Sequence, residues 1–218
     1  MLQKLGKYQD ATEHHENALA ISREIGDRKL EADVYGNLGI VFQKLGDYEK
    51  AREYQEKALA ISEKTGDRER HATCYNNLGT IFQSCGDYAA AEKYFKRGLA
   101  LSEEIGDIAK QFQILNNLAR LEYSAGKIQE KLSYLALSIE KCEQLRGFLG
   151  KNDQFKISFF HENIYPYYKL SELLCNTGKI EEALYVSELW RARALADLMS
   201  AGYFDENQIL ANHLFTKP

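Results

Sequence analysis

The feature that most constrains this sequence is that it repeats itself every 40 residues. A glycine recurs at this interval, at Gly6, Gly46, Gly86 and Gly126. A second glycine, followed by aspartate, does the same at 26–27, 66–67 and 106–107. A fifth copy of the first marker, Gly178, follows after 52 residues, which indicates an insertion of about 12 residues. A fixed period of this length is typical of a solenoid, in which small units stack in a row.

Each repeat is predicted to contain two helices. Apolar residues recur at helical spacing between Asp27 and Gly46, and again between Asp47 and Gly66. Glycine favours the left-handed conformation that ends a helix, and the aspartate after it can cap the next one. We therefore expect helices of roughly 18 residues. The residues expected to end first helices are Gly6, Gly46, Gly86, Gly126 and Gly178, and those expected to end second helices are Gly26, Gly66 and Gly106.

Two helices cannot bury their apolar faces alone, so the pairs must stack on their neighbours. We predict an all-α fold, a right-handed superhelical solenoid of antiparallel helix pairs. Residues 1–145 are expected to hold the repeats, the first of them truncated. Residues 146–202 would form an irregular insertion and a C-terminal helix pair, and residues 203–218 a tail or the start of a following domain. Pro166 falls in the first helix of that last pair, which either begins near Tyr165 or kinks at the proline.

The repeat markers resemble those of tetratricopeptide (TPR) repeats. Tyr35, Leu38, Gly39 and Phe42, followed by an alanine at position 51, are similar to the W-x2-L-G-x2-Y…A pattern of that family. The next copy has Tyr75, Leu78, Gly79, Phe82 and Ala91. The small residues fit places where two helices cross closely. The resemblance implies a scaffold that binds a protein or peptide partner in a concave groove lined by the first helices.

Two TPR groups have repeats of this length. The Asn-Leu-Gly and Gly-Asp-Arg motifs look like those of Pins-like G-protein-signalling modulator scaffolds, and equally like those of TPR arrays that precede CHAT (caspase-like) domains. The segment 182–184 and the Ala/Leu-rich run 191–198 are similar to the last repeat before a CHAT domain. This resemblance implies an alternative function, a regulatory or structural solenoid preceding such a domain. Its working surface would be residues 190–203.

The expected groove has an asparagine ladder with one residue per repeat, Asn37, Asn77 and Asn117. An amide offers donors and an acceptor together, so it can bracket a unit of peptide backbone. As an alternative, these amides form hydrogen bonds between the helices themselves. The residues predicted to bind a peptide are Asn37, Asn77, Asn117, Gln43, Gln83, Asn76, Asn116, Arg120 and Lys44. Because charges are sparse among them, we do not expect the clustered Lys/Arg that clamps an acidic C-terminus.

Composition and motifs argue against other classes. The net charge of −4 is unlike that of a general nucleic-acid binder, and no stretch approaches the apolar length of a membrane span. Cysteines 74, 85, 142 and 175 form no CxxC pair, so we expect free thiols and a cytoplasmic location. Weak self-association through the truncated first repeat is a further possibility.

We expect no enzyme, cofactor or metal site. His71 and Cys74 are only two potential ligands, and two ligands do not make a metal site. His161-Glu162 lacks the second histidine of HExxH. Cys175 and His161 would lie about 20 Å apart along one helix, too far for a catalytic dyad. The glycines stand singly between helices rather than in a phosphate-binding loop.

Overall fold

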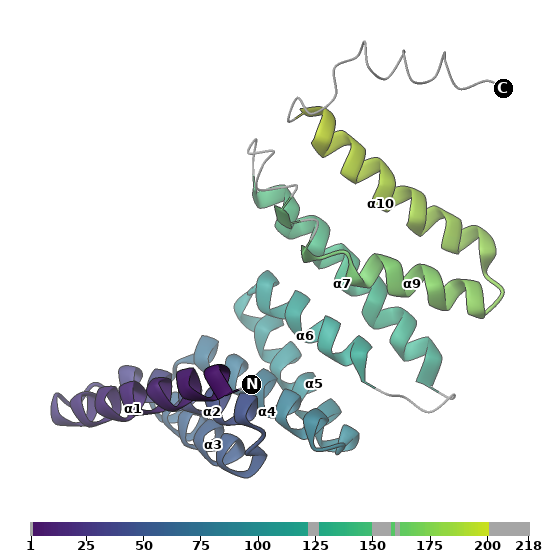
Figure 1. Ribbon diagram of the computed structural model, residues 1–218. Helices are drawn as coiled ribbons and strands as arrows, with labels where there is room; N and C mark the ends of the chain where they lie inside the picture. Colours follow the sequence, from purple (N-terminus) through teal and green to yellow (C-terminus); the bar gives the residue numbers. More distant parts are fainter. Residues whose placement is uncertain (1, 122–126, 150–157, 160–161, 201–218) are drawn as a thin grey trace. The chain divides into compact units, whose positions relative to one another are not determined.

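The computed structural model describes residues 2–121, 127–149, 158–159 and 162–200. The chain divides into two compact units, residues 1–123 and 124–218. In the described residues of the first unit the elements are the helices α1 (Leu2–Glu24), α2 (Arg28–Leu45), α3 (Tyr48–Thr65), α4 (Arg68–Ser84), α5 (Tyr88–Ile105) and α6 (Ile108–Arg120). The second unit has α7 (Ile128–Phe148), α9 (Tyr165–Asn176) and α10 (Ile180–Ser200). The prediction of an all-α array of helix pairs is confirmed (Figure 1).

Helices α2 to α5 begin and end as the sequence predicts, whereas α6 ends at Arg120, before the predicted Gly126. An aspartate precedes each of α2 to α6, and its carboxylate accepts a hydrogen bond from the backbone N–H three residues later, as in Leu30 N to Asp27 Oδ1 at 2.9 Å. The glycines that follow α1 to α5 have positive φ, for example +83° at Gly46. These caps satisfy backbone groups that a helix end leaves unpaired.

The prediction that Gly6 ends a helix is wrong, because α1 runs through it from Leu2 to Glu24. Gly46 and Gly86 are each followed by an aspartate that caps the next helix, whereas Gly6 is followed by Lys7. Lysine has no acceptor for the first backbone N–H groups of a new helix, so the glycine stands here without the cap that would begin the next helix. Gly126 lies outside the described residues.

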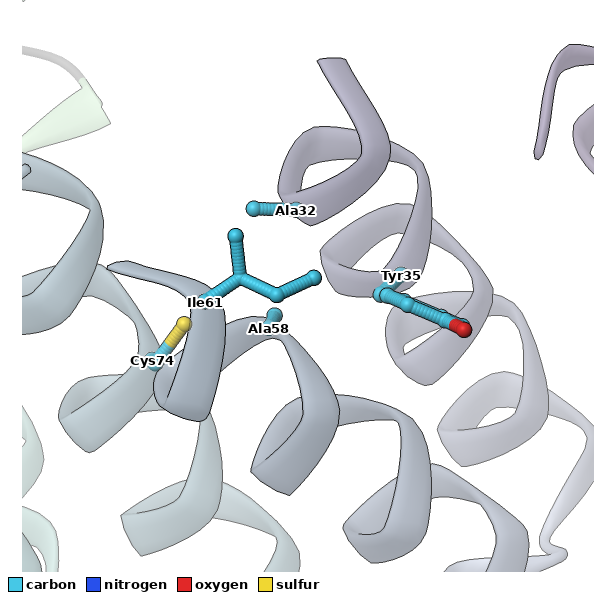
Figure 2. Packing of buried hydrophobic residues seen from close by; sticks show 5 residues of the cluster. All are labelled: Ala32, Tyr35, Ala58, Ile61 and Cys74. Carbon is cyan, nitrogen blue, oxygen red and sulfur yellow. The ribbon is translucent and has the colours of Figure 1, made fainter. Parts of the chain in front are cut away.

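The first unit is built by stacking. α2 pairs with α3 and α4 with α5, while α3 packs against α4 and α5 against α6. Figure 2 shows where three of these helices meet, with Ala32 and Tyr35 on α2, Ala58 and Ile61 on α3, and Cys74 on α4. All five side chains are buried. Each pair therefore shares its core with the next one, as a solenoid requires.

In the second unit, α9 packs against both α7 and α10. α9 begins at Tyr165 with Pro166 in its first turn, which confirms the first of the two alternatives for this proline. Tyr167 Oη donates a hydrogen bond of 2.6 Å to Glu143 Oε1 on α7. The other carboxylate oxygen of Glu143 lies 3.3 Å from Nε of Arg193 on α10. One buried tyrosine and one carboxylate thus connect the three helices.

Candidate functional site

The candidate site is the surface of the first helices α2, α4 and α6, here called the ladder face. α2 contacts α4, and α4 contacts α6, so equivalent residues form rows across the three helices. One row is the asparagine ladder itself. A second contains Asp33, Thr73 and Gln113, and a third contains Ile40, Thr80 and Arg120. The ladder face therefore presents mainly amide and hydroxyl groups.

The three ladder asparagines differ in their surroundings. Asn37 is exposed, while Asn77 and Asn117 are half-buried. Asn77 Nδ2 donates to Gln55 Oε1 at 3.4 Å, and Asn117 Nδ2 donates to Asn76 Oδ1 at 2.9 Å. No hydrogen bond of the Asn37 side chain is found within the described residues. Asn37 thus offers its full set of donors and acceptors to a ligand, whereas the other two already use one donor each.

Asn77 on α4 bonds to Gln55, the residue at the point where α2 and α3 cross. Gln55, fully buried on α3, donates from Nε2 to the carbonyl oxygen of Gly36 at 2.8 Å. The same amide presses on Gly39, where a Cβ atom would lie 2.6 Å from Gln55 Nε2. Gln55 therefore joins its own first helix to the next one, since its Oε1 accepts from Asn77.

The equivalent crossing of α4 and α5 is built differently. Phe95 replaces the glutamine and is fully buried against Gly79, where a Cβ would lie 2.5 Å from the ring. A phenyl ring has no acceptor for the next asparagine. Asn117 bonds instead to Asn76, a residue that is 9% exposed and stands where the preceding repeat has Gly36.

The remaining predicted residues lie on or beside the ladder face. Gln43 Nε2 donates to Thr80 Oγ1 at 3.3 Å, which connects α2 and α4. Lys44 and Arg120 are exposed, and Gln83 and Asn116 are half-buried. Thus Asn76, Asn117 and Gln43 form hydrogen bonds between helices, while Asn37 and Lys44 point to solvent. Whether any of these residues binds a peptide stays a prediction.

Sequence reasoning missed two residues near this face. Gln55 comes from a second helix, and its contact with Asn77 depends on how successive pairs stack. Arg70 forms an ion pair with Asp33 of the preceding first helix. The sequence pattern that could have identified these residues is a change of side-chain type between equivalent positions of successive repeats, from Gln55 to Phe95 and from Leu30 to Arg70.

The metal-ligand and thiol candidates of the sequence can be compared with the described residues. No group of three or more His, Cys, Asp and Glu side chains there could hold a metal ion. Burial raises the pKa of the Cys74 thiol to about 12, so this cysteine is protonated at neutral pH and poorly nucleophilic. His161 of the rejected Cys–His dyad lies outside the described residues. Among the described helices, none has the length and hydropathy needed to cross a bilayer.

Comparison with known proteins agrees with the repeat pattern. Tetratricopeptide repeat family models match residues 1–64, 30–104 and 113–153. No curated protein matches the sequence.

Solved structures show the same fold. BtubC (BKLC) from P. vanneervenii is 24% identical, with a TM-score of 0.68 over 89% of this chain and 76% of that one. A putative kinesin light chain with nearly identical TPR-like repeats, from Podosopora anserina, is 19% identical, with a TM-score of 0.60 over 88% and 89%. The Rap conjugation gene regulator of the plasmid pLS20, in complex with the Phr* peptide, is 21% identical, with a TM-score of 0.59. It matches over 98% of this chain and 55% of that one. With its 40-residue helix pairs and these family matches, the chain belongs to the tetratricopeptide repeat family.

Proposed function

We propose that the chain is a non-catalytic scaffold that captures a partner peptide on the ladder face. The observation on which the proposal depends is Asn37, an exposed amide in a row of asparagines, with no hydrogen bond to the described residues. An amide side chain can donate to a peptide carbonyl and accept from a peptide N–H at once. Binding through the peptide backbone is the mode that such a surface favours.

The charges near Asn37 support modest selection by charge. Arg70 is paired with Asp33, so its charge is largely compensated. Lys44 is exposed at the end of α2 and forms no ion pair with the described residues. A single lysine does not make the two-point carboxylate clamp that needs clustered cations. The complex of the Rap regulator with a peptide is consistent with a TPR array of this fold taking a peptide ligand.

The experiment starts from a peptide selected from a random library by the wild-type chain. Its affinity is then measured for the wild type and for a variant in which Asn37, Asn77 and Asn117 are replaced by alanine. Loss of about one net hydrogen bond at each of the three sites, roughly 1 kcal/mol each and about 3 kcal/mol in all, predicts weakening of about 100-fold. Circular dichroism must show that the variant remains helical.

Lys93→Ala is the matched control, because Lys93 is exposed on α5, a second helix, and lies outside the ladder face. It should leave the affinity unchanged. Equal affinity of the wild type and the folded triple variant would contradict the proposal. The alternative function, a solenoid that serves a C-terminal caspase-like domain, stays a prediction. Part of its expected surface, residues 201–203, lies outside the described residues.

A further inference from the structure

A second surface of the molecule departs from the repeat pattern. Gly46, Gly86 and Gly178 all have positive φ and precede α3, α5 and α10, which aligns these second helices residue by residue. Their alanines at 51, 91 and 183 are all buried, which confirms the register. Tyr185 of α10 then corresponds to Glu53 and Lys93. A tyrosine that is 69% exposed thus stands where two equivalent helices have a charge.

Tyr185 borders a groove in the second unit, here called the α10 groove. Its volume is about 570 Å³, and its walls come from α7, α9 and α10. Its apolar lining includes Leu132, Leu170, Leu174 and Val186. This size is in the range of ligand-binding clefts.

The equivalent groove of the first unit is smaller and more polar. It has a volume of about 300 Å³ and is lined in part by Glu49, Arg52 and Asp87. In the α10 groove the residues at the first two of these positions are Gln129 and Leu132. Two of the three charges at this place in the first unit, Glu49 and Arg52, are therefore replaced by an amide and an apolar side chain, while Lys179 stands where the first unit has Asp87. The floor of the groove is thus apolar, with Leu132, Leu174 and Val186 just below its surface, and the exposed Tyr185 stands at its edge. A concave apolar site of this kind is a candidate binding site.

The chemistry of the rim indicates what the groove accepts. Glu181 and Glu182 line it together with Lys179, whose Nζ lies 3.2 Å from Glu182 Oε1. This ion pair leaves Glu181 as the carboxylate that can face a cation. The walls are helices whose backbone groups are bonded internally. An extended peptide would find no backbone partners there, whereas a helix brings its own backbone bonds.

We propose that the α10 groove binds an amphipathic helix of a partner protein, with apolar side chains against Tyr185 and Leu174 and a Lys or Arg opposite Glu181. This site is distinct from the ladder face and does not depend on the function proposed for it. A chain with both sites would hold two partners at once.

The test uses the full 218-residue chain and fluorescent helical peptides of about four turns. One peptide has leucines along one face and lysines on its flanks, a second has glutamates on the flanks, and a third has serines in place of the leucines. Fluorescence anisotropy should show saturable binding of the leucine–lysine peptide and binding at least tenfold weaker for the other two.

The variants separate this site from the rest of the molecule. Tyr185→Lys, which restores the residue type of α5, should weaken the leucine–lysine peptide at least tenfold. Glu181→Lys should weaken that peptide and strengthen the glutamate-flanked one. Tyr88→Lys, which changes an exposed tyrosine on α5, should leave the affinity of the leucine–lysine peptide unchanged.

Three results would overturn the proposal. The first is that no peptide binds saturably, and the second is that Tyr185→Lys binds as the wild type does. The third is a concentration-dependent rise in mass by light scattering that Tyr185→Lys abolishes, because the groove would then be filled by a second copy of this chain.

Discussion

The crossings of α2 with α3 and of α4 with α5 occupy the same place in successive repeats, yet they are held by different forces. The first has a buried amide, Gln55, which bonds to the Gly36 carbonyl and accepts from Asn77. The second has a buried ring, Phe95, pressed on Gly79. Both need a small residue on the first helix, but only the first crossing can supply an acceptor to the next asparagine.

The consequence reaches the ladder face. Where the crossing residue is an amide, the ladder asparagine bonds to it weakly, at 3.4 Å from Asn77 Nδ2 to Gln55 Oε1. Where the crossing residue is phenylalanine, the next ladder asparagine bonds to Asn76 at 2.9 Å instead. The crossing of α9 and α10 uses a third solution, in which the hydroxyls of Ser171 and Ser187 lie 2.8 Å apart. The equivalent crossings thus have the same position in each helix pair, but they are filled by an amide, by an aromatic ring or by two hydroxyl groups.

The largest contrast should come from removing the crossing side chains. Phe95→Ala should lower the free energy of unfolding by about 3–5 kcal/mol, because it opens a cavity at the centre of α4 and α5. Gln55→Ala should cost less, about 1–3 kcal/mol, because it removes an amide and the hydrogen bonds that the amide makes. Urea unfolding followed by circular dichroism measures both. Equal losses would mean that the two crossings are held in the same way.

The second contrast concerns glycines. Gly79→Ala should destabilise the fold by about 1–3 kcal/mol, since its Cβ would meet the Phe95 ring at 2.5 Å. Gly36→Ala should stabilise it by about 0.5–1 kcal/mol, because its nearest neighbour is Arg70 Nη1 at 3.6 Å and alanine favours a helix interior. The midpoint of thermal unfolding should therefore move in opposite directions. A lower midpoint for Gly36→Ala would show that this position is more tightly packed than the structure indicates.

The smallest contrast separates the ladder asparagines by stability. Asn117→Ala should cost about 1–3 kcal/mol, because it leaves the buried Asn76 amide without its donor. Asn37→Ala should stay within about 0.5 kcal/mol of the wild type, as exposed substitutions usually do. Asn77→Ala, at a longer hydrogen bond, should fall between them. If all three variants had the same free energy of unfolding in urea, the hydrogen bonds of Asn117 and Asn77 would contribute nothing to stability.

Much of the fold follows from local rules in the sequence. Asp27 and Gly46 mark the start and the end of the first helix of a pair by capping chemistry that acts over a few residues, and Asp47 and Gly66 do the same for the second. The same rules explain the wrong boundary at Gly6, where Lys7 stands in place of the capping aspartate. For Pro166 the sequence allows two alternatives, a helix that begins near Tyr165 or a helix that kinks at the proline. The structure shows the first.

The candidate site was less predictable, because its hydrogen bonds join residues that are far apart in the sequence. Asn76 and Asn117 are 41 residues apart, and their contact depends on the distance between successive first helices. The sequence left open whether ladder amides serve the fold or a ligand. In the structure the side chains of Asn77 and Asn117 form hydrogen bonds to Gln55 and Asn76, whereas that of Asn37 forms none with the described residues. Whether a ladder asparagine serves the fold therefore depends on whether a polar side chain of another helix lies opposite it.

The most direct test of this account is the affinity of a library-selected peptide for the Asn37→Ala variant. Asn37→Ala should weaken binding about fivefold, the loss of roughly 1 kcal/mol of hydrogen bonding, with no change in the midpoint of urea unfolding. An unchanged affinity in a fully folded variant would contradict it, because the one ladder asparagine that the fold does not use would then have no part in binding.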